Sequence, residues 1–299
     1  MSREPGESDT LVEEGDPLAA LERAVQRQPA DAEAWGDLGQ AYHARGQAEL
    51  AIEALRTATR LDPLSAAHWH WLSMSLALRD EREPALEAAR KAAALEPDSA
   101  YLATHLGRQL LRADRPREAI RHLEEAARRD PASAVPVGLL GVAQFRAGDF
   151  AGAAESLEDS LRKDPEDPVL WAFLGASLDE TERPEPGAWA LETAVFSRPD
   201  YGWAWGRLGK ALRAMGRHDE AVRAYEKAVE HGFAPAVLWS DMGESAAEVR
   251  DLERLRRACR ELGRLDAERA KPLRRRLRSL RLAQSPGTAA PAPTLRPRG

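Results

Sequence analysis

The sequence predicts an all-α repeat protein, because residues of the same type recur every 34 positions along most of its 299 residues. Prolines keep this spacing from Pro29 to Pro199, and tryptophans keep it, with two interruptions, from Trp35 to Trp239. A period of this length is typical of an array in which each unit is one supersecondary element. Such a unit buries its apolar face only against its neighbours, so contacts between successive units are expected to stabilise the fold.

Each unit is predicted to consist of a helix, a turn, a second helix and a stop. Three residues after the tryptophan position comes an apolar residue and then a small one, as at Leu38 and Gly39, which lets the second helix approach closely. The proline ends the second helix, since it lacks an N–H and disfavours helical geometry in the residue before it. Glycine or an acidic residue marks the turn between the helices, at Gly46, Asp80, Asp114, Gly148, Glu182 and Gly216.

This pattern resembles that of the tetratricopeptide repeat (TPR) family, whose members are right-handed superhelical solenoids of helix-turn-helix repeats. Its signature of Trp, Leu-Gly, aromatic, Ala, bulky apolar, Ala and Pro is carried by Trp35, Leu38-Gly39, Tyr42, Ala51, Leu55, Ala58 and Pro63. The units recur without an insertion, although Ala103 and Val137 replace the tryptophan in units three and four. We therefore expect one elongated body rather than two globular domains.

The expected organisation has five parts. A flexible acidic N-terminus over residues 1–15 precedes a partial repeat helix over 16–31. Seven repeats follow over 32–268, then a basic amphipathic capping helix over 269–283 and a disordered tail over 284–299.

Charge is distributed unevenly along the chain. The net charge is −6, but residues 250–281 hold 13 Lys or Arg against five acidic residues, which makes this stretch +8. A terminal capping helix is the first explanation, and binding of an acidic partner, a nucleic acid or a membrane surface are alternatives. No aromatic residue stands among the arginines of the last helix, which makes nucleic acid an unlikely partner.

Composition indicates a cytoplasmic protein without a membrane span. No apolar run is long enough to cross a bilayer, and residues 1–16 lack the apolar core of a secretion signal. The single cysteine, Cys259, excludes an internal disulfide and stands at an apolar repeat position, so a buried thiol is expected.

The sequence contains no motif for catalysis or for a cofactor. A Gly-rich phosphate loop, a His-Glu-x-x-His pair, paired cysteines and a nucleophile elbow are all absent, so we predict no enzyme activity, no cofactor and no metal site. His43, His70 and His105 map to inner positions of three successive units and could come close together. We expect them to be exposed or hydrogen-bonded rather than metal ligands.

The TPR resemblance also implies that the first helix of each unit lines an inner, concave groove. Transferred to this chain, the inner positions of units two to five carry an apolar stripe with cations beside it. The predicted partner-binding residues are Trp71, Met74, Tyr101, Arg108, Arg112, Leu139, Val142, Phe145, Arg146, Phe173, Arg207 and Lys210. Val135 belongs to the same stripe. Such a surface suits a peptide or a partner helix, and the alternative is packing against neighbouring helices or a second copy.

From these observations we expect a non-catalytic scaffold or adaptor that binds a peptide or partner helix in its concave groove. The alternatives are a regulatory or assembly subunit of an enzyme complex, or an enzyme with an unrecognised groove site. Neither the partner nor the oligomeric state follows from the sequence.

Overall fold

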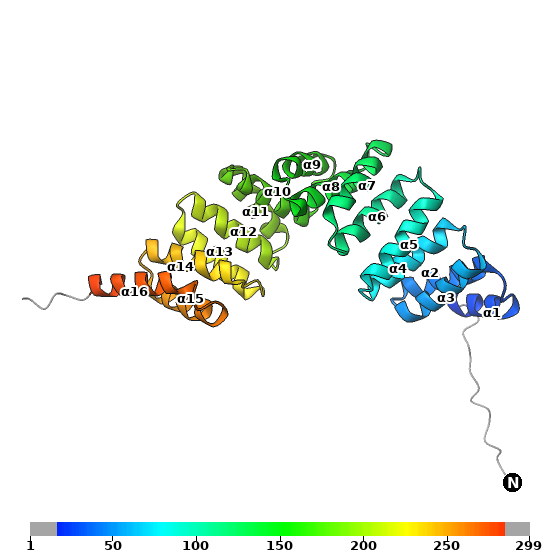
Figure 1. Cartoon of the computed structure of the whole chain (residues 1–299), viewed down its shortest axis with the longest axis horizontal. Helices are drawn as coiled ribbons and strands as arrows, with labels where there is room; N and C mark the ends of the chain where they lie inside the picture. The colour runs from blue at the N-terminus through cyan, green and yellow to red at the C-terminus, as the bar shows by residue number, and fades with distance from the viewer. Residues whose placement is uncertain (1–16, 285–299) are drawn as a thin grey trace, which may run out of the picture. The chain divides into compact units, whose positions relative to one another are not determined.

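A computed structural model of the chain describes residues 17–284. Within this range the chain forms sixteen α-helices and no β-strand (Figure 1). The N-terminus expected over residues 1–15 to be flexible lies outside the described residues, and so do residues 285–299 of the expected tail.

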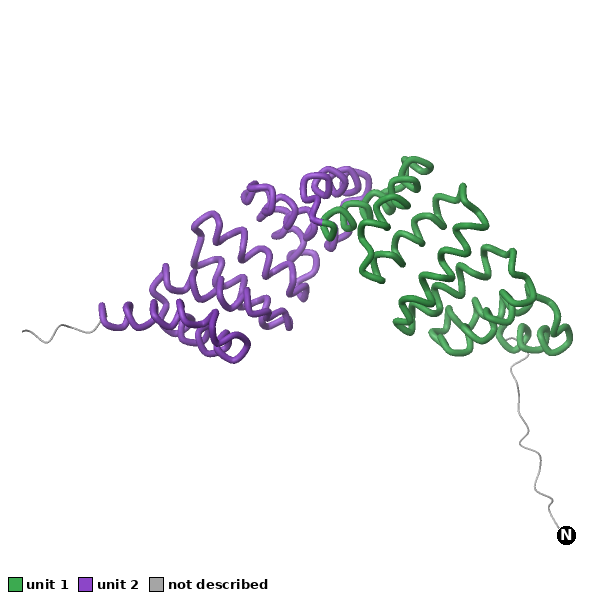
Figure 2. The backbone as a smooth tube through the Cα atoms, viewed as in Figure 1, with its two compact units in different colours: residues 1–147 green, residues 148–299 purple. Residues whose placement is uncertain are grey.

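The chain divides into two compact units, residues 1–147 and 148–299 (Figure 2). The first contains α1 (Pro17–Arg27), α2 (Ala32–Ala44), α3 (Ala48–Leu61), α4 (Ala66–Leu78), α5 (Arg82–Leu95), α6 (Ala100–Arg112), α7 (Pro116–Arg129) and α8 (Ala134–Ala147). The second contains α9 (Phe150–Lys163), α10 (Pro168–Glu180), α11 (Pro184–Ser197), α12 (Gly202–Ala214), α13 (His218–Glu230), α14 (Ala236–Glu248), α15 (Leu252–Leu265) and α16 (Ala270–Gln284).

The boundary between the units separates the two helices of the fourth expected repeat, a division that the unbroken sequence period does not indicate. In each unit, every helix packs against the next one along the chain. The first helices of successive repeats also contact each other, as α2 does with α4 and α12 with α14. The all-α repeat solenoid predicted from the sequence is confirmed in these helix pairs.

A hydrogen bond explains why tryptophan and proline share one period. The indole Nε1 of Trp35 donates to the carbonyl oxygen of Pro29 at 2.9 Å, and the same bond recurs three times at 2.7–2.9 Å. The other donors are Trp69, Trp171 and Trp205, each bonded to the proline six residues before it. The bond fixes the loop between one repeat and the next by satisfying a carbonyl that no helix can pair.

The predicted turn residues adopt the left-handed backbone conformation. Gly46, Gly148 and Gly216 have φ angles of 72°, 90° and 72°, while Asp80, Asp114 and Glu182 have 56°, 58° and 59°. Glycine enters this region without steric cost, and the acidic residues occupy it where no glycine is present. The interpretation of these six positions as helix-ending turns is confirmed.

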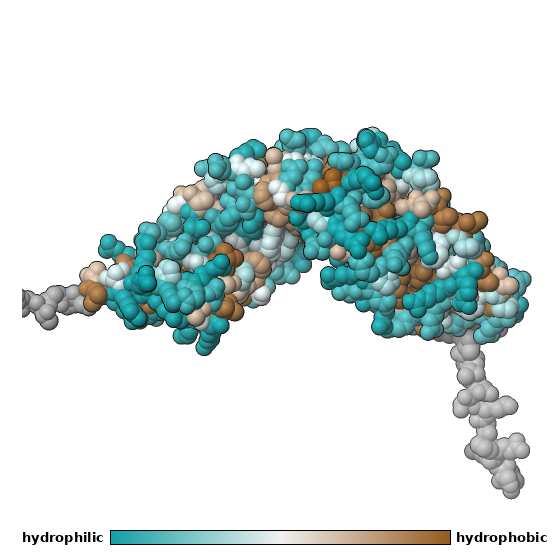
Figure 3. All heavy atoms as spheres, viewed as in Figure 1, coloured by the Kyte–Doolittle hydropathy of each residue, from teal (hydrophilic) through white to brown (hydrophobic). Residues whose placement is uncertain are grey.

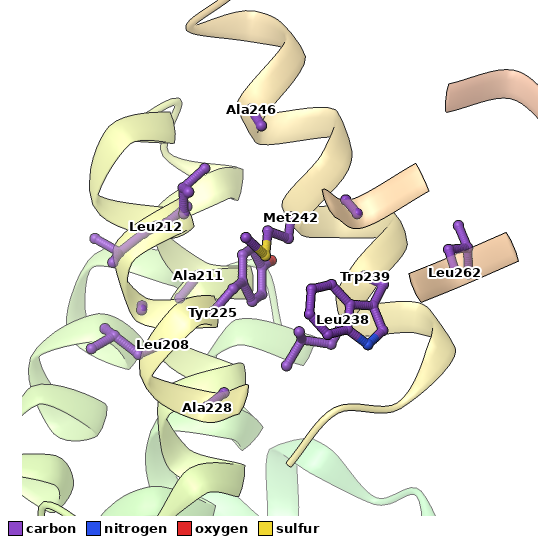
Figure 4. Packing of buried hydrophobic residues seen from close by; sticks show 14 of the residues in the cluster. Leu208, Ala211, Leu212, Tyr225, Ala228, Leu238, Trp239, Met242, Ala246 and Leu262 are labelled. Carbon is purple, nitrogen blue, oxygen red and sulfur yellow. The ribbon is translucent and has the colours of Figure 1, made fainter. Parts of the chain in front are cut away.

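The core of each unit lies between the two layers of helices. In unit 2, Tyr225 and Met242 are almost fully buried and lie close to Leu238 and Trp239 (Figure 4). Gly209 makes room for this packing, because a Cβ there would lie 2.6 Å from the ring of Tyr225. Each fully buried side chain of this size stabilises the fold by about 2 kcal/mol.

The basic helix α16 packs on α14 and α15 through its apolar residues. Leu273 is 3% exposed and lies against Gly243 of α14, where a Cβ would approach its Cδ1 to 2.5 Å. Leu277 is 8% exposed, whereas Leu282 on the same helix is 75% exposed. Capping of the last repeat by α16 remains a prediction that these two leucines can test.

We expect Leu277→Asp to lower the free energy of unfolding by about 3 kcal/mol, because it places a carboxylate in the contact between α16 and the last repeat. Leu282→Asp is the matched control and should change it by less than about 0.5 kcal/mol. Urea unfolding followed by circular dichroism measures both. Equal unfolding curves for the two variants would show that α16 does not cap the repeat.

Candidate functional site

Three inner helices of unit 1 surround a cavity of about 330 Å³. Met74 comes from α4, Tyr101 and Arg108 from α6, and Val135 from the start of α8. The remaining lining residues are Ala100, Thr104, His105, Asp130, Ser133 and Pro136. Three of the predicted partner-binding residues, Met74, Tyr101 and Arg108, are therefore brought together by the fold.

The cavity has exposed apolar walls. Tyr101 is 64% exposed and Val135 is 49% exposed, although both are large apolar groups at inner positions. Hydrophobic residues also gather on unit 1 in the space-filling view, in brown among hydrophilic ones in teal (Figure 3). A contiguous apolar surface of this kind is typical of a binding site.

Two of the three inner histidines, His70 and His105, lie beside the cavity and close to each other, and both are hydrogen-bonded. The ring centroids of His70 and His105 are 4.4 Å apart, and the hydroxyl of Tyr101 lies 2.9 Å from Nε2 of His70. His105 Nε2 lies 2.8 Å from Oγ of Ser73, which itself donates to the carbonyl of Ala85 at 2.7 Å. Since the Ser73 proton is used on Ala85, His105 must donate its Nε2 proton to Ser73.

Both imidazoles are neutral at pH 7. Burial lowers the pKa of His70 to about 4, and the nearby His43 lowers it further in the same direction. Burial lowers the pKa of His105 to about 3, assisted by the charges of His70 and Arg108. The wall of the cavity therefore carries no histidine charge, and an apolar group can enter without desolvating one.

Arg108 differs from the other predicted cations of unit 1. Its side chain is exposed and forms no ion pair or hydrogen bond with a described residue. Asp130, another lining residue, belongs to the turn before α8 and is exposed. The cavity thus has a cation available to a ligand next to its apolar walls.

Arg112 and Arg146 instead connect successive repeats. Arg112 donates to the carbonyl of Ala77 at 2.6 Å, and Arg146 donates to the carbonyl of Leu111 at 2.8 Å. Arg146 also pairs with Asp114 at 3.0 Å. Each of these carbonyls stands at the end of an α-helix and also accepts a backbone N–H, from Asp80 and Asp114 respectively. A role in partner binding stays a prediction for both arginines.

The other predicted apolar residues of unit 1 lie outside the cavity lining. Leu139 and Val142 are partly buried against the cluster of α5–α8, and Trp71 packs against the cluster of α3–α5. The ring of Trp71 also contacts His43 and His70, at centroid distances of 5.4 and 5.8 Å. Phe145 is partly buried in α8. These side chains contribute to packing, and a role in partner binding stays a prediction for them.

In unit 2, the predicted residues form a separate aromatic and charged surface. Phe173 of α10 lies 5.0 Å from Trp203 of α12 between ring centroids, and the guanidinium of Arg207 lies 5.6 Å from the Trp203 ring. Glu180 accepts from Arg207 at 3.0 Å and from Lys210 at 2.8 Å. Burial opposes ionisation of Glu180, but these two cations outweigh it and lower its pKa. Lys210 also pairs with Asp179 at 3.0 Å, so Arg207 and Lys210 both have acidic partners within unit 2.

Sequence reasoning missed several residues of the cavity and of the unit 2 surface for different reasons. Asp130 and Ser133 lie in a turn, where the helical position rule does not apply. Trp203 occupies the second position of its repeat, an inner position by the same rule that selected Tyr101, so the sequence contained the signal. Thr104 donates its hydroxyl to the carbonyl of Ala100 at 2.7 Å and contributes its methyl face.

Neither a metal site nor a membrane-spanning helix is found in the described part of the chain. Between residues 17 and 284, no three His, Cys, Asp or Glu side chains are grouped to hold a metal ion. No helix in this range is both long and apolar enough to cross a membrane. The Cys259 thiol is buried and free, as expected, and burial raises its pKa.

Comparison with solved structures shows the same fold at low sequence identity. A chain of the APC/C hetero-tetramer Cut9–Hcn1 matches with a TM-score of 0.65 and 16% identity, over 87% of this chain and 52% of that chain. Pseudomonas aeruginosa pilF matches with a TM-score of 0.60 and 23% identity, over 75% of this chain and 99% of pilF. YrrB, described as a TPR protein with an unusual peptide-binding site, matches with a TM-score of 0.54 and 18% identity, over 62% of this chain and 96% of YrrB.

Family models give the same result from the sequence side. No curated protein matches the chain. Three models of the tetratricopeptide repeat match it, over residues 7–66, 110–177 and 202–231. Together these matches extend over more than half of the sequence and into both compact units. The chain therefore belongs to the tetratricopeptide repeat family.

Proposed function

We propose that this protein is a non-catalytic interaction scaffold that binds a peptide or a helical segment of a partner on the inner surface of unit 1. The proposal rests mainly on the cavity formed by α4, α6 and α8. The exposed side chains of Tyr101 and Val135 line it together with the unpaired cation of Arg108. TPR proteins generally serve as interaction scaffolds, and the fold shared with YrrB supports the same class of function.

The size and polarity of the cavity suit one side chain of a partner. A volume of about 330 Å³ accommodates a single aromatic or branched aliphatic group, and the flexible thioether of Met74 can adapt to its shape. Because His70 and His105 are neutral, such a group can displace water from the cavity without desolvating a charged histidine. Arg108 then pairs with an acidic residue next to the anchor.

The close pair of Ser73 and His105 resembles a nucleophile and its base, but its geometry argues against catalysis. Ser73 is fully buried, so no substrate reaches its Oγ. Its proton is donated to the carbonyl of Ala85, and the imidazole donates to the serine rather than accepting from it. The pair therefore connects α4, α5 and α6, which is a structural function.

The test begins with selection of random peptides displayed on phage against the full chain, followed by fluorescence anisotropy of a selected peptide. We expect Tyr101→Ala to weaken binding by about 30-fold, since a buried aromatic anchor contributes about 2 kcal/mol. Arg108→Ala should weaken it by about three- to fivefold, with an effect that fades at high salt. Leu64→Ala, an exposed apolar residue outside the cavity, is the control.

Tyr101→Phe separates the ring from the hydroxyl that contacts His70. It should retain most of the affinity if the ring is the anchor. The proposal is wrong if the selection yields no peptide whose affinity falls in Tyr101→Ala while the melting temperature stays unchanged.

A further inference from the structure

The outer helix α11 in unit 2 exposes two large aromatic side chains on one face. Phe196 is 88% exposed and Trp189 is 60% exposed. The two residues are seven positions apart, which is two helical turns, so they form one ridge along the helix. Exposed aromatic groups that are contiguous in this way mark an interaction surface.

The composition of α11 sets it apart from the other outer helices. It contains two charged residues, Glu185 and Glu192, whereas the outer helices α3, α5, α7, α9, α13 and α15 contain four to seven each. An outer helix that faces only water is normally rich in charge. The low charge of α11 therefore indicates a face that is covered in the functional state.

A groove lies on each side of this ridge, with both apolar and charged residues in its lining. The groove toward α13 has a volume of about 870 Å³ and is bordered by Phe196, with Trp205, Leu208 and Ala224 among its walls. The groove toward α9 has a volume of about 380 Å³ and is bordered by Trp189. Its walls include Trp171, whose ring meets that of Trp189 edge-on at 5.3 Å.

We propose that this surface binds a second copy of the chain, with two α11 helices packed antiparallel about a two-fold axis. A ridge with grooves beside it is self-complementary, since each ridge can enter the grooves of the other copy. An axis that passes between positions 192 and 193 puts Trp189 of one copy opposite Phe196 of the other. Glu192 lies nearest the axis; Arg217, which its charge reaches, is already paired with Glu220 at 2.7 Å.

The area available agrees with a dimer interface. At about 150–250 Å² per aromatic side chain, the exposed parts of Trp189 and Phe196 amount to roughly 300 Å² per copy, or roughly 600 Å² for two copies. These two aromatic groups thus provide about half of the ~1,200 Å² that a stable interface buries, and the grooves beside them are the surface from which the other half would come.

Sedimentation velocity of the full chain, from about 1 to 100 µM, tests the oligomeric state. We expect a reversible dimer, and Phe196→Asp should raise its dissociation constant by at least about 100-fold, because two anchors are lost per dimer. Leu64→Asp replaces an apolar residue of unit 1 that is 75% exposed, and it should leave the dissociation constant unchanged. Phe196 is almost wholly exposed, so the variant should keep the native melting temperature of the monomer. A monomeric wild type at 100 µM, or an unchanged dimer in Phe196→Asp, would overturn the proposal.

A cysteine scan tests the antiparallel arrangement. Cys259 is the only native cysteine and is buried, so an introduced thiol reports on its own position. Glu192→Cys lies next to the axis and should form an intermolecular disulfide under mild oxidation. Glu185→Cys should not, because its copies would lie about 22 Å apart along the helices. Crosslinking of position 185 without position 192 contradicts the proposed axis.

Discussion

Gly175→Ala is expected to lower the free energy of unfolding by about 3 kcal/mol, at the upper end of the range for overpacked cores. A Cβ at Gly175 would lie 2.6 Å from the carbonyl oxygen of Gly187 and 3.0 Å from the backbone nitrogen of Leu191. These are backbone atoms of α11, so α10 and α11 must move apart to relieve the contact. The greater helix propensity of alanine offsets only about 1 kcal/mol of this loss of stability.

Gly263→Ala is the matched control, because it makes the same chemical change at a position where a flexible side chain can move away. The new Cβ would meet the guanidinium end of Arg274, a flexible side chain that can move into solvent. Stability should therefore stay the same or rise by up to about 1 kcal/mol. Urea unfolding of both variants against the wild type measures the difference. If both glycines tolerate alanine equally, close approach of the helix pair is not what requires glycine at position 175.

The period of the sequence was sufficient to predict the helix pairs because each repeated residue has one local physical role. Trp35 donates a hydrogen bond to Pro29, only six residues before it. Gly46 ends its helix because its own backbone adopts a positive φ angle. Such contacts depend on a few neighbouring positions, so they repeat whenever the residues repeat. The division into two compact units depends on contacts summed over many helices, and no single position indicates it.

The candidate site was predicted only in part. The position of a residue in a helix determines the helix face that carries its side chain, but it does not determine which atoms the end of a long side chain contacts. Tyr101 and Arg112 both leave the inner face of α6. The rigid tyrosine ring stays in the cavity, while the long arginine extends to the carbonyl of Ala77 in the preceding repeat. Residue type does not show which carbonyl at a helix end will accept a second hydrogen bond from a side chain. The role of Arg112 is therefore visible only in three dimensions.

The aromatic ridge of α11 shows a different limit of sequence reasoning. Trp189 and Phe196 stand at a spacing that is also compatible with packing in the helix pair. Their neighbours Ala190 and Val195 are indeed buried in the core of unit 2. A rotation of α11 by a fraction of a turn would exchange buried and exposed positions, and the helix period alone does not fix that rotation.

Acidification is expected to destabilise unit 1 through His70 and His105. Their pKa values in the folded chain, about 4 and about 3, lie below the ordinary value of 6.5. The unfolded chain therefore binds protons that the folded chain excludes, and the stabilisation present above pH ~6.5 is lost as the pH falls toward about 4. With full linkage the two groups would lose about 5 kcal/mol between pH 7 and pH 4.5. Because the cavity admits water beside them, we expect about 3 kcal/mol.

The double variant His70→Gln/His105→Gln isolates this effect, since glutamine can keep the bonds made by Nε2 to Tyr101 and Ser73 but does not titrate. Its free energy of unfolding should fall less steeply with acidification than that of the wild type, by about 3 kcal/mol between pH 7 and pH 4.5. His231→Gln, at the exposed end of α13, controls for loss of an imidazole elsewhere. Urea unfolding at both pH values gives the comparison. Carboxylates titrate in the same range in every variant, so only the difference between wild type and double variant reports the histidines. Parallel pH dependences in the two proteins would mean that the pKa values of His70 and His105 are not lowered in the folded chain. Both imidazoles would then be charged below about pH 6.5, and the cavity would lack the uncharged wall on which apolar binding depends.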